Sequence, residues 1–116
     1  MPACEVWDLV KVPFPYTNRP VQQRRPALVV AIPDAPAALN LLWVLMITSA
    51  GNRGWPGDVV VSNLDEAGLP APSVVRLAKI ATIEAGDAER MGRLPHADQL
   101  QVADVLRGCF GQILAL

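Results

Sequence analysis

The segment Arg24-Arg25-Pro26-Ala27-Leu28-Val29-Val30-Ala31-Ile32 sets two adjacent arginines directly before an apolar run of strand-forming residues. Pro26 keeps Arg25 out of the helical region of backbone conformation, so the Arg25 side chain is expected at the entrance of the strand. A second apolar run ends at Thr48 and Ser49. A guanidinium and a hydroxyl placed where buried strands meet loops are suited to bind and polarise a phosphodiester.

Short strand-like runs separated by proline-marked and glycine-marked loops fill most of the chain, and a helical pattern follows Pro95. Six short strands predict a small barrel, with a helix that packs on it through a broad apolar face. The strands are expected at Val6–Val12, Ala27–Ile32, Leu41–Ile47, Asp58–Val61, Ser73–Ile83 and Glu89–Arg93. The helix face comprises Leu100, Val102, Ala103, Val105, Leu106, Cys109, Phe110 and Ile113.

Length and composition predict one domain, residues 1–116, with apolar surface to spare. A chain of this length buries less than about 70% of the surface that its unfolded form exposes. The hydrophobic fraction of 52% and the mean hydropathy of +0.29 are high for so small a chain. A homodimer interface is the simplest way to cover the excess. Trp43, inside a run of aliphatic residues, is expected in the core.

The cysteines and the N-terminal residues point to a cytoplasmic protein. Cys4 and Cys109 lie near opposite ends of the chain without a CxxC motif, which favours free thiols over a disulfide framework or a zinc site. No apolar run approaches the roughly 18 to 20 residues of a membrane span, and the first residues lack the features of a signal peptide. We therefore expect no membrane association.

The net charge of -1 does not favour a polyanionic partner, but the arginines gather in or beside loops. Two of the ten basic residues are Lys, so the other eight are Arg. A local positive groove on a neutral body is compatible with single-stranded RNA as the partner. The candidate RNA contacts are Tyr16, Thr17, Asn18, Arg24, Ser49, Arg53 and Arg76. The alternative for the arginines is an ordinary surface position, and for Arg25 a surface ion pair with a carboxylate.

The residue types limit the chemistry. His96 is the single histidine and stands at the expected helix start, which excludes a two-histidine ribonuclease mechanism. No acidic pair accompanies the loops, so metal catalysis is poorly supported. RNA can be cut by attack of its own 2′-hydroxyl, which needs positioning and charge stabilisation. Arg25, with a pKa above about 12, suits the stabilising role and is a poor general base.

The chain resembles the MazF/PemK-type toxins, the endoribonucleases of type II toxin-antitoxin pairs. The resemblance runs nearly end to end and rests on segments in the family's order: DLVKVPFPYTN, RRPALVV, ITSA, PGDVVV, AGLPAPSVVRLAKI and MGRLP. Each segment alone is a weak pattern. Five or more of them in the right order and spacing form a specific one.

The resemblance implies a mainly β fold with α, a small SH3-like barrel of the CcdB/MazF type with a C-terminal helix. It also implies a symmetric homodimer that holds single-stranded RNA in a groove at its interface. Arg25 and Thr48 match the family's catalytic positions. Such toxins cleave without a metal or other cofactor, leaving a 2′,3′-cyclic phosphate and a 5′-hydroxyl, and the flexible acidic tail of a cognate antitoxin occupies the same groove.

Two positions depart from the family pattern. Trp7 stands where relatives usually have the glycine of a Gly-Asp pair, and Ala78 stands where they commonly carry Asp, a candidate for proton transfer or base contact. Two other functions stay open. One is a growth inhibitor of the same fold that acts on a protein such as a topoisomerase, and the other is an RNA-binding module with weakened chemistry. Trp55 fits either a base-stacking role or a place against the barrel.

Overall fold

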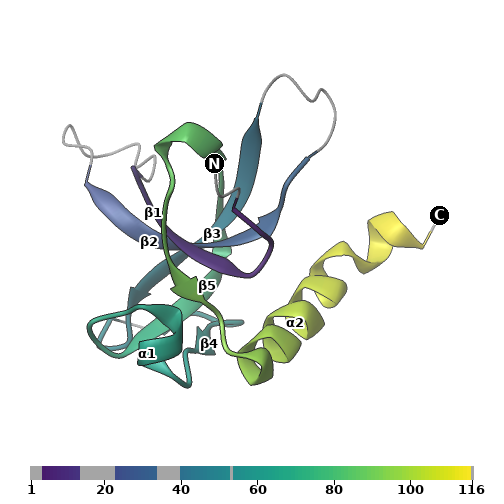
Figure 1. Cartoon of the computed structure of the whole chain (residues 1–116). Coiled ribbons are helices and arrows are strands. Elements are labelled where there is room, and N and C mark those ends of the chain that lie inside the picture. Colours follow the sequence, from purple (N-terminus) through teal and green to yellow (C-terminus); the bar gives the residue numbers. More distant parts are fainter. Residues whose placement is uncertain (1–3, 14–22, 34–39, 53, 116) are drawn as a thin grey trace.

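The computed structural model describes residues 4–13, 23–33, 40–52 and 54–115. They form a six-stranded antiparallel sheet and a long C-terminal helix (Figure 1). The elements are β1 (Asp8–Pro13), β2 (Arg24–Ala31), β3 (Leu41–Ser49), β4 (Val59–Val60), α1 (Leu64–Ala67), β5 (Ser73–Glu84), the 3-10 helix η2 (Ala85–Asp87), β6 (Glu89–Arg93) and α2 (His96–Leu114). The six expected strands and the helix after Pro95 are confirmed.

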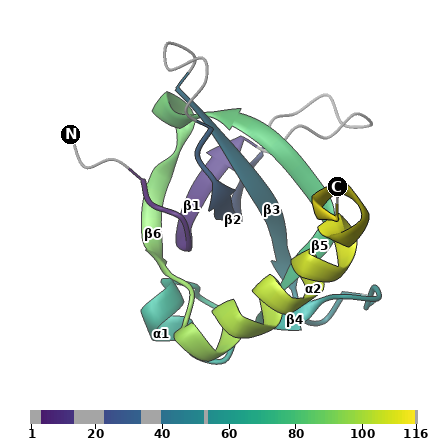
Figure 2. The same cartoon turned by 90° about the vertical axis from the view of Figure 1, so that its right-hand side faces the viewer.

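The strand order is β4-β5-β3-β2-β1-β6, so most neighbours in the sheet are also neighbours along the chain. The sheet curls into a half-barrel with α2 across its lower part (Figure 2). This confirms the mainly β, barrel-like fold with a C-terminal helix. In β5, Ile80 pairs with Leu45 whereas Arg76 pairs with Met46, so residues 77–79 form a bulge. A bulge of this kind bends its strand and increases the local twist.

Both faces of the sheet are covered by apolar side chains. Leu9 and Leu28 belong to a first core cluster, whereas their chain neighbours Val10 and Val29 belong to a second core cluster. Successive residues of a strand point to opposite faces, so a strand buried on both faces is apolar at every position. This accounts for the unbroken apolar runs of β2 and β3 and for much of the high hydrophobic fraction.

The chain turns at Val6 and Trp7, so the expected start of the first strand at Val6 is wrong. The Asp8 amide donates to the Glu5 carbonyl at 3.0 Å, and Trp7 has a φ of 81°, in the region that favours glycine. The Trp7 amide donates to the Val29 carbonyl at 2.8 Å, and its indole packs on the first core cluster. These contacts hold Trp7 in the conformation that a glycine would adopt without strain.

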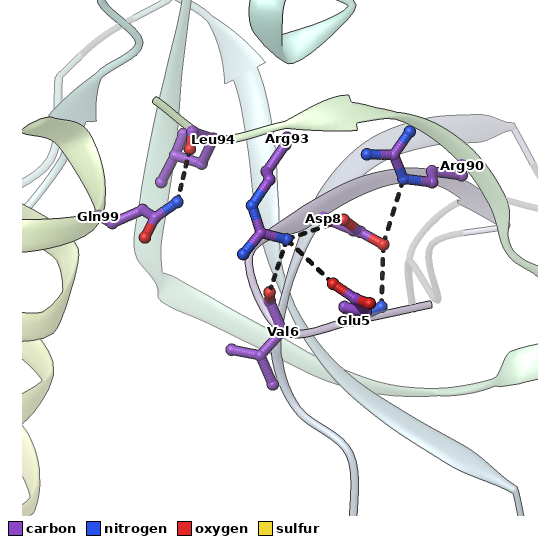
Figure 3. A network of polar contacts seen from close by, with 7 residues as sticks. All are labelled: Glu5, Val6, Asp8, Arg90, Arg93, Leu94 and Gln99. Carbon is purple, nitrogen blue, oxygen red and sulfur yellow. Dashed lines mark hydrogen bonds and ion pairs between the residues drawn. The ribbon is translucent and has the colours of Figure 1, made fainter. Parts of the chain in front are cut away.

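A buried carboxylate fastens this turn to β6 (Figure 3). Asp8 accepts a hydrogen bond from the Glu5 amide at 2.9 Å, and it pairs with Arg90 at 3.3 Å and Arg93 at 3.4 Å. Arg93 also donates to the Val6 carbonyl at 3.4 Å. A buried carboxylate is tolerated when several donors satisfy it, as they do here.

The short helix α1 was not expected from the sequence, because four residues are too few to show a helical period. Asn63 caps its start by accepting from the Glu66 amide at 3.1 Å, and Gly68 ends it with a φ of 76°. The backbone of α1 packs directly on β6. A Cβ on Gly68 would meet the Met91 carbonyl, and a Cβ on Gly92 would meet the Ala67 backbone.

Helix α2 begins at His96 and is anchored to the barrel by its first turns. Asp98 is 1% exposed, and its carboxylate accepts from the amide and the hydroxyl of Ser62 at 2.8 and 3.0 Å. Val102 is buried in the first core cluster. From Arg107 to Ala115 every residue is exposed, and the helix extends away from the sheet (Figure 1). Of the expected apolar helix face, Val102 and Leu106 therefore pack on the core, whereas Leu100 is 59% exposed.

The exposed apolar surface of the described chain includes Trp43, Ile80, Phe110, Ile113 and Leu114. Trp43 is 43% exposed, so its expected place in the core is wrong. Trp43 shares a face of β3 with Leu45, which is fully buried in the first core cluster. The side chains that bury Leu45 on this face do not reach Trp43, two residues away along the strand.

Cys4 and Cys109 are free thiols, as expected. Burial raises the pKa of the Cys4 thiol, and the negative charge of Asp8 raises it further. In the described part of the chain, no helix combines the length and apolarity needed to cross a membrane.

The close packing of α1 on β6 predicts the effect of a single methyl group. Gly68→Ala is expected to lower the free energy of unfolding by about 2–4 kcal/mol, since the alanine is strained at this φ and its Cβ overlaps the Met91 carbonyl. Gly86→Ala is the control, because nothing lies within 4 Å of its Cβ. Urea unfolding of both variants measures the difference. Equal stabilities would contradict the described packing.

Candidate functional site

A pocket of about 130 Å³ opens where β2 begins and β3 ends. Ala27 at the start of the paired part of β2 lies opposite Met46 near the end of β3. Arg25 and Thr48, just beyond this pair on the two strands, both line the pocket. The predicted pair of guanidinium and hydroxyl is therefore at one cavity. The complete lining is Arg25, Pro26, Ile47, Thr48, Ser49, Leu69, Pro70, Ala71, Pro72 and Ser73.

Arg25 is half-buried and its charge is not neutralised by a carboxylate among the described residues. Its Nη2 donates to the side-chain oxygen of Gln23 at 2.9 Å, and Gln23 is neutral. Its Nε is buried and has no hydrogen-bond partner in the described part of the protein. A buried donor without a partner costs free energy, and an anion in the pocket would supply the charge partner that the guanidinium lacks. The geometry does not support the alternative of a surface ion pair for Arg25.

Thr48 and Ser49 begin a turn that is held by local hydrogen bonds. The Thr48 hydroxyl accepts from the side-chain amide of Asn52 at 2.7 Å. The Ser49 hydroxyl accepts from the Gly51 amide at 3.2 Å, and the Ser49 carbonyl accepts from the Asn52 amide at 3.1 Å. These bonds fix the position of both hydroxyls at the pocket.

The segment 69–73, which follows α1 and ends at the first residue of β5, also lines the pocket. It contains two prolines, which restrict its backbone. The Pro72 carbonyl accepts from the Ala50 amide at 3.0 Å, and the Ser73 hydroxyl donates to the Ala71 carbonyl at 2.8 Å. This segment is thus tied to the turn after β3.

Arg24 and Arg76 were predicted to contact RNA, and neither lines the pocket. Arg24 donates to the Lys11 and Asp87 carbonyls at 3.0 and 3.1 Å. Successive residues of a strand point to opposite sides, which separates Arg24 from Arg25. Arg76 is 7% exposed and forms two hydrogen bonds with Asp58, at 3.2 and 2.9 Å.

Arg76 and Asp58 hold Trp55 against the barrel. The Arg76 guanidinium lies 4.5 Å from the centre of the Trp55 ring, and Lys79 lies 5.5 Å from it. The Trp55 amide donates to Asp58 at 3.0 Å. The hydrogen bonds from Arg76 hold the pKa of Asp58 below its usual range. Trp55 keeps 38% of its surface exposed, so it packs against the barrel at the edge of solvent.

The remaining predicted contacts, Tyr16, Thr17, Asn18 and Arg53, lie outside the described residues. Ala78 lies exposed in the bulge of β5, so this position offers a methyl group where the family commonly has a carboxylate. Among the described residues, no three His, Cys, Asp or Glu side chains gather in an arrangement that could hold a metal ion.

Sequence reasoning did not identify Gln23 or Asn52 as parts of the site. Asn52 stands in a Ser-Ala-Gly-Asn turn pattern that indicates local side-chain hydrogen bonds, but not which hydroxyl receives them. Gln23 carries no distinctive signal, although its partner Arg25 is only two residues away. Pro70 and Pro72 mark the segment 69–73 as a loop, but its place at the pocket depends on contacts between distant parts of the chain.

The sequence matches a family model over residues 5–110, described as the PemK-like, MazF-like toxin of type II toxin-antitoxin systems. The curled sheet, the C-terminal helix and the pocket between β2 and β3 agree with a toxin of this barrel class. The chain belongs to the PemK-like, MazF-like toxin family. No curated protein matches its sequence.

Solved structures show the same fold. MazF of Deinococcus radiodurans (Form-I) is 24% identical, with a TM-score of 0.69 and all of both chains covered. A MazE-MazF structure (Form-I) from the same organism is 25% identical, with a TM-score of 0.63 and full coverage of both chains. The Mycobacterium tuberculosis toxin MazF-mt6 is 23% identical, with a TM-score of 0.64, and the match covers 88% of this chain and 95% of that one.

The Asp58–Arg76 pair predicts a pH-dependent contribution to stability. The pKa of folded Asp58 is lowered, so the pair stabilises the protein at neutral pH and this contribution is lost as the pH falls below about 4. Asp58→Asn is expected to cost about 1–3 kcal/mol at pH 7 and less at pH 3. Urea unfolding at both pH values measures this, with Asp104→Asn, an exposed α2 position, as the control. A cost that is independent of pH would contradict the assignment.

Proposed function

We propose that this toxin is an endoribonuclease that cleaves single-stranded RNA by attack of the 2′-hydroxyl on the adjacent phosphate. The supporting observation is the shared pocket of Arg25 and Thr48, in which a buried Arg25 donor has no partner among the described residues. Membership in the MazF-like family, whose members are generally endoribonucleases, supports the same reaction.

In the proposed reaction, the 2′-oxygen forms a bond to phosphorus while the bond from phosphorus to the 5′-oxygen breaks. The products are a 2′,3′-cyclic phosphate and a 5′-hydroxyl. Arg25 donates hydrogen bonds to the phosphate oxygens, and its fixed charge stabilises the extra negative charge of the phosphorane. Thr48 donates from its hydroxyl to a phosphate oxygen and fixes the geometry.

Proton transfer is the weaker part of the site. Neither a carboxylate nor an imidazole is present in the described lining of the pocket, and Arg25 stays protonated. We assign the 2′-hydroxyl proton to water, and a second water protonates the leaving 5′-oxygen. Catalysis then rests on positioning and charge stabilisation, which needs no metal or other cofactor and agrees with a modest rate.

The RNA follows the rim of the pocket in this proposal. Ser49 contacts the backbone beside the scissile phosphate, and the arginines provide positive charge along the path. Tyr16, Thr17, Asn18 and Arg53, which precede β2 or follow β3 in the sequence, are proposed as further contacts. Arg24 is proposed as a contact away from the pocket, because it lies on the other side of β2 from Arg25. Arg76 acts indirectly, by holding Trp55 at the edge of the barrel.

We further propose a cytoplasmic homodimer with a cognate antitoxin. The exposed side chains of Phe110, Ile113 and Leu114 on the second half of α2 form an apolar surface suited to a second subunit. The MazE-MazF structure from Deinococcus radiodurans, at 25% identity, supports an antitoxin partner. An acidic antitoxin segment in the pocket would satisfy Arg25 as a phosphate does.

The nuclease proposal predicts cleavage of a long RNA in EDTA, with 5′-hydroxyl ends. Arg25→Ala is expected to lower kcat by about 10³-fold or more and to weaken RNA binding only in part, since it removes charge stabilisation. Thr48→Val is expected to cost about 10²-fold because one donor is lost. Arg107→Ala and Thr82→Val are the matched controls at exposed positions, with activities near wild type.

End mapping and single-turnover kinetics read out these variants. RNA binding without cleavage by the wild type would overturn the nuclease and favour an RNA-binding module. Neither binding nor cleavage, together with inhibition of topoisomerase supercoiling, would favour a protein target.

The dimer proposal predicts that a charge on the exposed part of α2 separates the subunits. Ile113→Asp is expected to shift the protein from dimer to monomer, because an ionised carboxylate cannot be buried without a partner. Analytical ultracentrifugation measures the mass, with Gln101→Asp at an exposed polar position of the same helix as the control. A dimer that survives Ile113→Asp would exclude this surface as the interface.

A further inference from the structure

Asn52 donates two separate hydrogen bonds in the turn after β3, one from its backbone and one from its side chain. Its backbone amide already closes the turn by donating to the Ser49 carbonyl at 3.1 Å. Its side-chain amide donates separately to the Thr48 hydroxyl at 2.7 Å, the shortest hydrogen bond in this turn. The second bond joins two side chains across the turn. It acts on the one hydroxyl that shares the pocket with Arg25.

The direction of this hydrogen bond determines where the Thr48 proton goes. A hydroxyl has one proton to donate and two lone pairs that accept, whereas an amide nitrogen only donates. Because Asn52 supplies the proton in their shared bond, the Thr48 proton cannot point at Asn52. No acceptor for it is present among the described residues of the protein. It is free to be donated to a group in the pocket.

On β2, a side-chain amide likewise holds the Arg25 guanidinium. Gln23 accepts from Arg25 Nη2 through its side-chain oxygen, so an amide holds the guanidinium without neutralising it. No carboxylate pairs with this guanidinium among the described residues. The two amides thus fix a pair of donors, one from each strand, that face the same 130 Å³ space. A phosphate, which carries only acceptors, is the complementary ligand.

We propose that Asn52 is a positioning residue that fixes the Thr48 hydroxyl as a hydrogen-bond donor to the scissile phosphate. This inference rests on the proposed ribonuclease function and adds a residue to its machinery. Asn52 does not touch the substrate in this role. It selects one of the two ways in which the Thr48 hydroxyl can be oriented, before RNA binds, and so removes a reorganisation step from catalysis.

The test inverts the polarity of Asn52 without changing its shape. In Asn52→Asp, a carboxylate replaces the donor and accepts the Thr48 proton, which turns the hydroxyl away from the pocket. We expect a fall in kcat of about 10²-fold, similar to that of Thr48→Val. Asn52→Leu, which leaves the hydroxyl free to rotate, is expected to cost less, about 10-fold. Unfolding by urea should be nearly unchanged, because Asn52 is exposed.

Two comparisons separate orientation from added negative charge. Asn63→Asp makes the same chemical change at the cap of α1, where a carboxylate accepts as well as the amide oxygen does, and it should retain wild-type kcat. In the Thr48→Val background, Asn52→Asp should lower kcat by less than about twofold, since no hydroxyl remains to be turned. Simple repulsion of RNA would lower activity equally in both backgrounds.

The outcomes also distinguish this inference from the function on which it rests. If the wild type cleaves RNA and Thr48→Val does not, but Asn52→Asp is fully active or its effect persists without the Thr48 hydroxyl, only the role of Asn52 is overturned. If the wild type does not cleave RNA, the nuclease and the role of Asn52 fail together. The non-additive loss of kcat in the double variant is the result that supports it.

Discussion

The pairing of β2 with β3 is the constraint on which the site depends. Because both strands are apolar on both faces, the alternation of polar and apolar residues does not set their register. The polar residues at the ends of the two strands help to set the register instead. A slip of two residues inward would carry the Arg25 guanidinium into the core, where a charge without a partner is very costly. The register that keeps Arg25 at the rim also brings it to the pocket that Thr48 lines.

Carboxylates neutralise most of the other arginines whose contacts the structure describes. Asp8 pairs with Arg90 and Arg93, and Asp58 pairs with Arg76. These pairs fasten turns to strands. Arg25 differs from them, because its described hydrogen-bond partner is a neutral amide. A body with a net charge of -1 can therefore present one uncompensated cation inside a pocket, which is the local field that a phosphodiester requires.

The sequence misled where a residue's environment is set by distant parts of the chain. The apolar run around Trp43 indicates burial, yet cover over that face of β3 ends near Leu45. Arginine is a residue type that binds phosphate, but the Arg76 guanidinium donates its hydrogen bonds to Asp58, eighteen positions earlier in the chain. Trp7 fits a strand by propensity, but it lies in a turn, where its amide donates to the Val29 carbonyl and its carbonyl accepts from the Leu94 amide.

The sequence by itself determined the six strands, the terminal helix, and the placing of Arg25 and Thr48 at strand ends, because propensity, proline and apolar runs act locally. It also carried the family's pattern in order, which implied the barrel. Only the tertiary structure decided that Arg25 and Thr48 share a cavity and that residues 69–73 complete its lining. These facts depend on register and on contacts between residues far apart in the chain, which no local pattern encodes.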